Sequence, residues 1–150
     1  MNKRQGYEGY GALLLTTVLL SAAAWAGSAS VHVTAAWTRP TPEGLSIAVG
    51  YMTLTNTGAK PVRLMTITSA IASHVEVHES RVQEGMAHMT ETVLQIEAGQ
   101  QRRLQPGGVH LMLMGLSRPL RLDEEVPLEM TFSDGQVLRT ALRVRPEPVQ

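Results

Sequence analysis

Histidine and methionine side chains recur in the second half of the chain with a spacing that suits a soft metal ion. Residues 109–114 read VHLMLM, so on a strand His110, Met112 and Met114 would share one face, opposite three apolar side chains. Cα atoms two residues apart on a strand are separated by about 6.6 Å, so His110 and Met112 can lean toward one ion. Thioether sulfur is a soft donor and imidazole a borderline one, and this pair favours copper, Cu(I) in particular. The segment therefore indicates a candidate Cu(I) site, with incidental placement as the alternative.

Two other segments offer side chains that could complete a four-ligand site. Segment 74–79 (HVEVHE) alternates, which places His78 and His74 together on its polar face. Along a strand these two histidines are about 13 Å apart, too far to bind one ion, so we expect His74 to be solvated. The glycine-flanked segment 85–89 is expected to form a turn, and spacing does not choose among its possible ligands, which are Met86, His88 and Met89.

The remaining methionines and the first histidine have simpler interpretations. Methionine commonly fills irregular gaps in a hydrophobic core, so we expect Met52, Met65 and Met130 to be buried. His32 follows the predicted secretory leader, and we expect it to be solvated.

Composition excludes several classes of function. The chain has no cysteine, which excludes disulfides, thiol catalysis and thiolate metal sites. Thirteen Lys and Arg residues balance 13 Asp and Glu residues, which argues against a nucleic-acid partner. No phosphate-binding glycine loop, GxSxG motif or HExxH motif is present. We therefore expect a binding protein and not an enzyme.

The hydrophobic pattern predicts strands and no helix beyond the N-terminal leader. Alternating or β-rich segments bounded by turn residues recur every 8–12 residues, which is typical of an antiparallel sandwich or barrel. Two hairpins are expected, over 46–68 and 126–144. The segments expected as strands are 31–37, 46–56, 62–68, 74–79, 92–97, 101–105, 109–114, 126–132 and 137–144.

The N-terminal segment has the pattern of a leader sequence. A short basic start precedes an uncharged apolar run over 11–24 and a small-x-small site. These features predict a secretory signal peptide, residues 1–26. Cleavage after Ser28 or Ser30 and an uncleaved membrane anchor are the alternatives. Residues 27–150 would then form one domain without a membrane span.

The spacing of the candidate ligands resembles that of the PCuAC family of periplasmic copper chaperones. His78 is followed after ten residues by Met89, and after twenty more by His110-x-Met112. The stretch 106–116 (PGGVHLMLMGL) resembles the most recognisable part of that family. The resemblance implies an all-β, cupredoxin-like antiparallel β-sandwich of Greek-key type. It also implies that one Cu(I) ion is bound by His78, Met89, His110 and Met112.

The resemblance further implies a role for the protein. It would carry Cu(I) in the bacterial periplasm toward the CuA centre of cytochrome c oxidase subunit II, with Sco-type copper proteins as partners. We expect it to act as a monomer, and we expect no catalysis because a closed four-ligand site leaves no position for a substrate. The alternative is a periplasmic β-sandwich interaction module whose His/Met face has no metal role.

Overall fold

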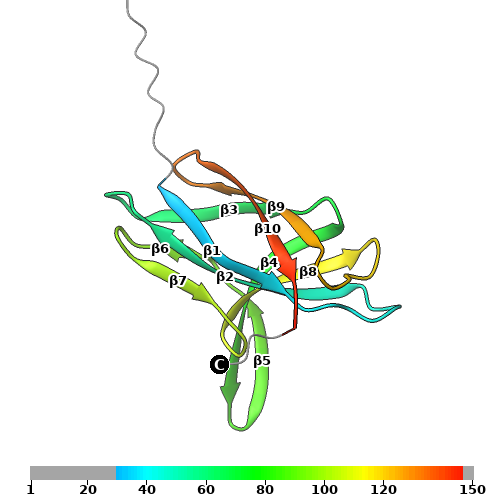
Figure 1. The fold of residues 1–150 in the computed structure, drawn as a ribbon. Coiled ribbons are helices and arrows are strands. Elements are labelled where there is room, and N and C mark those ends of the chain that lie inside the picture. The colour runs from blue at the N-terminus through cyan, green and yellow to red at the C-terminus, as the bar shows by residue number, and fades with distance from the viewer. Residues whose placement is uncertain (1–29, 147–150) are drawn as a thin grey trace, which may run out of the picture.

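The computed structural model describes residues 30–146, which form ten strands and no helix (Figure 1). The predicted signal peptide, residues 1–26, lies outside the described residues. No helix long and apolar enough to cross a membrane occurs in this part of the chain. The strands are β1 (Val31–Thr38), β2 (Ile47–Asn56), β3 (Val62–Thr68), β4 (Ala72–Gln83), β5 (Met86–Glu91), β6 (Gln95–Ile96), β7 (Gln101–Leu104), β8 (Val109–Leu116), β9 (Glu125–Phe132) and β10 (Val137–Val144).

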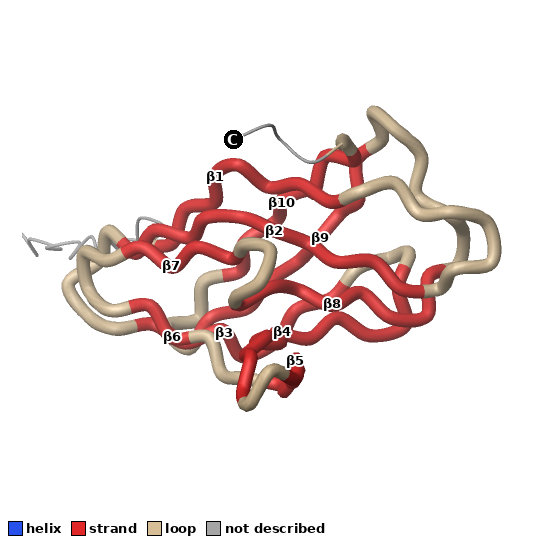
Figure 2. Tube along the Cα trace, turned by 90° about the horizontal axis from the view of Figure 1, so that it is seen from below, coloured by secondary structure: helices blue, strands red, loops and turns tan. Residues whose placement is uncertain are grey.

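The strands form one sheet that folds over on itself into a sandwich (Figure 2). Their order across the sheet is β5-β4-β8-β2-β1-β10-β9-β3-β6, and β7 pairs with β2. All described pairs are antiparallel except β1 with β10. β3 and β4 lie near opposite ends of this path and contact each other, so the two halves of the sheet close over the core. The all-β antiparallel sandwich predicted from the sequence is therefore confirmed.

The core lies between the two halves and is mainly aliphatic. Leu111 and Leu113 of β8 are fully buried, and Val77 of β4 packs in the same cluster, as the alternation predicts. Met52 and Met130 are buried as expected.

The prediction that Met65 is buried is wrong, because its side chain is 57% exposed. The pairing of β3 with β9 shifts register between Leu64 and Thr66. Before this shift Val62 is buried and Leu64 packs against the core, so the alternation of inward and outward side chains along β3 directs Met65 outward.

Of the two predicted hairpins, the one over 126–144 is confirmed by the pairing of β9 with β10. The one over 46–68 is wrong, because β2 pairs with β1, β7 and β8, whereas β3 pairs with β6 and β9. Buried Asn56 gives a physical reason, since its Nδ2 donates to the carbonyl oxygens of Lys60 and Ile96. These bonds hold the chain as it crosses from one half of the sandwich to the other.

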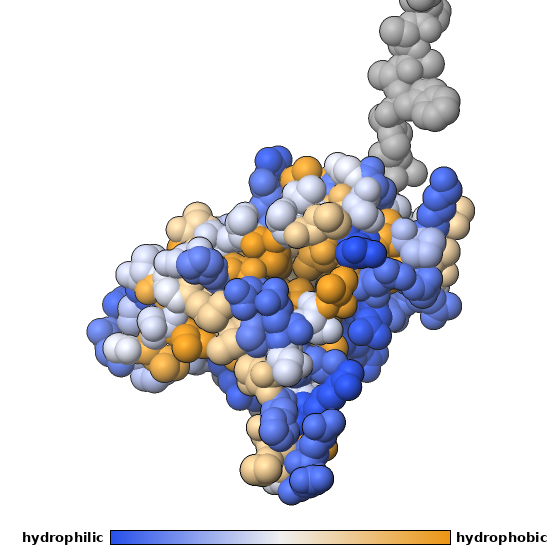
Figure 3. Space-filling view, turned by 180° about the vertical axis from the view of Figure 1, so that it is seen from behind, coloured by the Kyte–Doolittle hydropathy of each residue, from blue (hydrophilic) through white to orange (hydrophobic). Residues whose placement is uncertain are grey.

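A hairpin arm, residues 79–91, projects from the sandwich (Figures 1 and 3). β4 continues past its partner β8, and the chain turns at Glu84 and Gly85, which both have positive φ. It then returns as β5, paired with β4 along its whole length. The expectation of a turn over 85–89 is therefore wrong from Met86 onward, where a strand begins. Pairing with the extended β4 overrides the local turn signal of Gly85.

Candidate metal centre

Strands β4 and β8 place two histidines side by side on the outer face of the sandwich. His78 of β4 lies directly opposite His110 of β8 in the antiparallel register. Their ring centroids are 6.3 Å apart, and the ring planes are tilted by 42°. The neighbouring Val77 and Leu111 point into the core, so the alternation of both strands directs the imidazoles outward. The separation leaves room for one ion between the rings.

The His110 ring is held in one orientation by the backbone. Its Nδ1–H donates to the carbonyl oxygen of Gly108 at 2.9 Å. Because a carbonyl can only accept, Nδ1 carries the proton and Nε2 keeps a free lone pair. Nε2 is buried without a hydrogen-bond partner, and His110 as a whole is 3% exposed. The outward face of β8 is thus covered at this point.

The His78 ring is held in the corresponding way by a carboxylate. Its Nε2–H donates to Oε2 of Glu76 at 2.8 Å, two residues earlier on the same face of β4. Nδ1 of His78 is buried and has no partner. Sequence reasoning placed Glu76 on this face but gave it no role. The signal that could have found it is the Glu-x-His spacing of Glu76 and His78, since ligating histidines usually donate their second N–H to a carboxylate or carbonyl.

The two unpaired ring nitrogens indicate whether the space between His78 and His110 fits a metal ion. Buried polar atoms in folded proteins are nearly always hydrogen-bonded. Here one nitrogen of each histidine is anchored, while the other is buried without a partner. A metal ion bound to both free lone pairs would satisfy both atoms, so the imidazole pair fits a metal centre.

Met112 supplies a thioether next to this pair. It lies two residues after His110 on the same face of β8, and it is directly opposite Glu76 on β4. Its side chain is half-buried. Among residues 30–146, no three His, Cys, Asp or Glu side chains are grouped closely enough to hold a metal. The donors gathered here are imidazole nitrogen and thioether sulfur.

The register of the hairpin arm separates the candidates that sequence spacing left open. Met89 pairs with Ser80, which shares a face of β4 with His78. Met86 and His88 fall on the opposite face of the arm. Met89 is therefore the side chain of the three that lies on the histidine face. The Met89 side chain is 51% exposed. It therefore lies next to β4, the strand of His78, and remains open to solvent.

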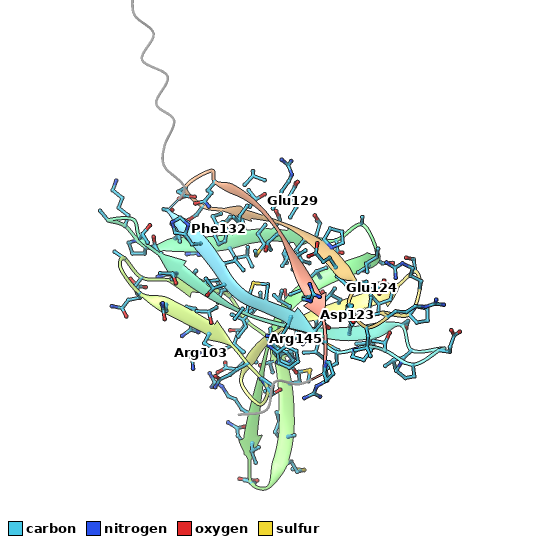
Figure 4. All side chains as sticks on the ribbon, viewed as in Figure 1. Arg103, Asp123, Glu124, Glu129, Phe132 and Arg145 are labelled. Carbon is cyan, nitrogen blue, oxygen red and sulfur yellow. The ribbon has the colours of Figure 1, made fainter. Side chains whose placement is uncertain are left out.

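An aromatic pair lies on the same outer face, two strands from β4. Val49 of β2 is opposite Met112, and two residues later Tyr51 is opposite Trp37 of β1. The two aromatic ring centroids are 4.7 Å apart. Arg145, labelled in Figure 4, lies over the Trp37 ring at 5.6 Å. Trp37 and Tyr51 are both buried, so a shielded aromatic pair flanks the histidine and methionine face.

Comparison of the sequence with protein families finds one that matches nearly all of the described chain. The model described as "Putative lipoprotein LpqE-like" matches residues 31–144. A relative from Leifsonia xyli subsp. xyli (strain CTCB07), described as "Putative lipoprotein Lxx21020", is 34% identical over 117 residues. The aligned part covers 77% of this chain and 69% of that protein.

Comparison with solved structures finds the same fold in PCuAC domains. The solution structure of CuI-DR1885 from Deinococcus radiodurans is 32% identical and has a TM-score of 0.61, covering 81% of this chain and 84% of that one. The copper-bound PCuAC domain from PmoF2 is 20% identical, with a TM-score of 0.66 and coverage of 78% and 93%. The cupredoxin-like β-sandwich that the sequence resemblance implies is confirmed.

The anchored rings predict fixed tautomers in the metal-free protein. At neutral to mildly alkaline pH, His110 should carry its proton on Nδ1 and His78 on Nε2, because each of these nitrogens donates a hydrogen bond. Long-range ¹H–¹⁵N NMR spectra of the imidazoles measure this directly. The exposed His32 and His88 serve as controls and should show mixed tautomers. Mixed tautomers at His78 and His110 would contradict the proposed anchoring.

Proposed function

The chain belongs to the LpqE-like family, and on that premise we propose that it is a copper chaperone that holds one Cu(I) ion. The ligands are His78, Met89, His110 and Met112. The observation that carries this proposal is the pair of opposite histidines, each with one anchored nitrogen and one buried, unpaired nitrogen. The Cu(I) form of the 32% identical Deinococcus protein supports copper as the cargo.

The donor set accounts for the choice of Cu(I). Two thioethers and two imidazoles form a soft, neutral set, whereas zinc usually takes Cys, His or carboxylate ligands and calcium takes oxygen. Glu76 supplies a negative charge beside the site, but its Oε2 is engaged by His78. Its role is then to fix the orientation of the His78 ring.

The four ligands differ in how firmly the fold holds them. The two histidines stand on paired strands of the sandwich and have anchored rings. Met89 stands on the projecting arm and is half exposed. An incoming acceptor can reach this thioether first, and acceptor thiolates hold Cu(I) better than thioethers do. The arrangement therefore suits a carrier that binds copper and then gives it up.

The destination follows from the family resemblance and from the chemistry of release. We place the protein in the periplasm, since the N-terminal segment predicts a signal peptide and the relative from Leifsonia is described as a lipoprotein. The acceptor is the CuA centre of cytochrome c oxidase subunit II, with Sco-type copper proteins as partners. Transfer of Cu(I) from thioether and imidazole ligands to thiolates is therefore thermodynamically favourable.

Substitution of each ligand should weaken Cu(I) binding while leaving the fold intact. His78→Ala, His110→Ala, Met89→Leu and Met112→Leu should each raise the Cu(I) dissociation constant by about tenfold or more, the scale seen when metal sites lose a supporting group. The measurement is an anaerobic competition titration against a Cu(I) chelator of known affinity, with circular dichroism to check folding.

Matched substitutions away from the site control this experiment. Met65→Leu changes an exposed methionine of β3, and His32→Ala changes an exposed histidine of β1. Both variants should bind as tightly as the wild type. If the wild-type protein binds no Cu(I), the alternative function, an interaction module with no metal role, would be favoured. If Met89→Leu leaves the Cu(I) dissociation constant unchanged while Met86→Leu raises it, the ligand is Met86 and not Met89.

Delivery is tested by mixing the Cu(I)-loaded protein with the soluble, copper-free CuA domain of subunit II. Copper should move almost completely to the CuA domain at equimolar ratio, because its thiolates are stronger Cu(I) ligands. Separation of the two proteins followed by metal analysis measures the transfer. A CuA domain with alkylated cysteines is the control and should receive none. Copper that stays on the chaperone in both samples would contradict the proposed destination while leaving Cu(I) binding intact.

A further inference from the structure

The outer face of β4 and β8 carries soft donors beyond the four proposed ligands. Directly opposite residues on the two strands form three successive rows on this face. The first row pairs His78 with His110, the second pairs Glu76 with Met112, and the third pairs His74 with Met114. Each row therefore contains an imidazole or a thioether, and the third row contains one of each.

His74 and Met114 are placed to share an ion. Side chains directly opposite in an antiparallel pair have Cβ atoms about 4.5–5.5 Å apart, within reach of one metal held between an imidazole and a thioether. The hydroxyl of Ser73 donates to the carbonyl oxygen of Gly115 at 3.2 Å, which fixes the register beside this row. The His74 side chain forms no hydrogen bond or ion pair with another residue of 30–146. Its ring is free to turn toward Met114.

Exposure decreases from the third row to the first. His74 is exposed, Met114 and Met112 are half-buried, and the His78 side chain is 16% exposed. His110 is 3% exposed. The soft donors thus run from solvent toward the histidine pair, in which His110 is buried. Met112 lies between them, with its Cα about 6.6 Å from that of Met114 along the strand.

We propose that His74 and Met114 form a second, more exposed Cu(I) site on the same face as the first. This inference rests on the proposed function, because it takes Cu(I) as the cargo. Cu(I) is a d¹⁰ ion that accepts as few as two ligands, and an imidazole with a thioether is a suitable soft pair. With two ligands and more solvent, the outer site binds more weakly than the four-ligand site. Sequence reasoning missed it because cross-strand register, not spacing along one strand, brings the two residues together.

The test is an anaerobic Cu(I) titration of protein labelled with ¹³C at the methionine methyl groups, followed by NMR. The first equivalent should shift the methyl signals of Met89 and Met112. The second equivalent should shift the methyl signal of Met114 and the ring signals of His74. A double variant, His74→Ala with Met114→Leu, should keep the first equivalent at unchanged affinity and lose the second, so that stoichiometry falls from two to one.

A matched double variant, His88→Ala with Met65→Leu, removes one exposed histidine and one exposed methionine that are not paired. It should still take two equivalents. The inference is overturned if the Met114 methyl signal is unmoved at two equivalents, or if the His74/Met114 variant retains the second equivalent or loses the first. Wild-type protein that takes no first equivalent would instead overturn the proposed function.

Discussion

The direct opposition of His78 and His110 across β4 and β8 is the constraint on which the rest of the site depends. Each ring has one nitrogen anchored, by Glu76 or by the Gly108 carbonyl, and one nitrogen buried without a partner. A buried, unpaired polar atom costs roughly 1–3 kcal/mol. The metal-free fold therefore carries a local penalty that a bound ion removes, a pattern expected where function competes with stability.

In the proposed copper chaperone, binding and release would depend on two kinds of element. The sandwich holds the imidazoles on paired strands with a hydrophobic core directly beneath them, which keeps their geometry fixed. The hairpin arm carries Met89, which is 51% exposed and which, in the proposed function, an acceptor would displace. A site built entirely in the core would hold copper well but would expose no ligand for exchange. The projecting arm would therefore allow both retention and transfer.

Local patterns in the sequence were enough to predict most of the strands, though not β5. They also predicted the faces of His78 and of His110 with Met112, because alternation along one strand is a local property. Local patterns could not show what depends on pairing between strands. The opposition of His78 and His110 and the pairing that forms the arm both follow from register, which is a long-range property. The choice among Met86, His88 and Met89 likewise needed the arm's pairing or a family resemblance.

X-ray absorption spectroscopy at the copper edge of the protein loaded with one equivalent of Cu(I) identifies the atoms that bind the copper. We expect a Cu(I) edge and a first shell containing both nitrogen and sulfur, with two sulfur scatterers. Met112→Leu and Met89→Leu should each leave one sulfur scatterer in place of two. A first shell of nitrogen and oxygen alone, unchanged by either substitution, would contradict the claim that thioethers and the opposed histidines bind copper together.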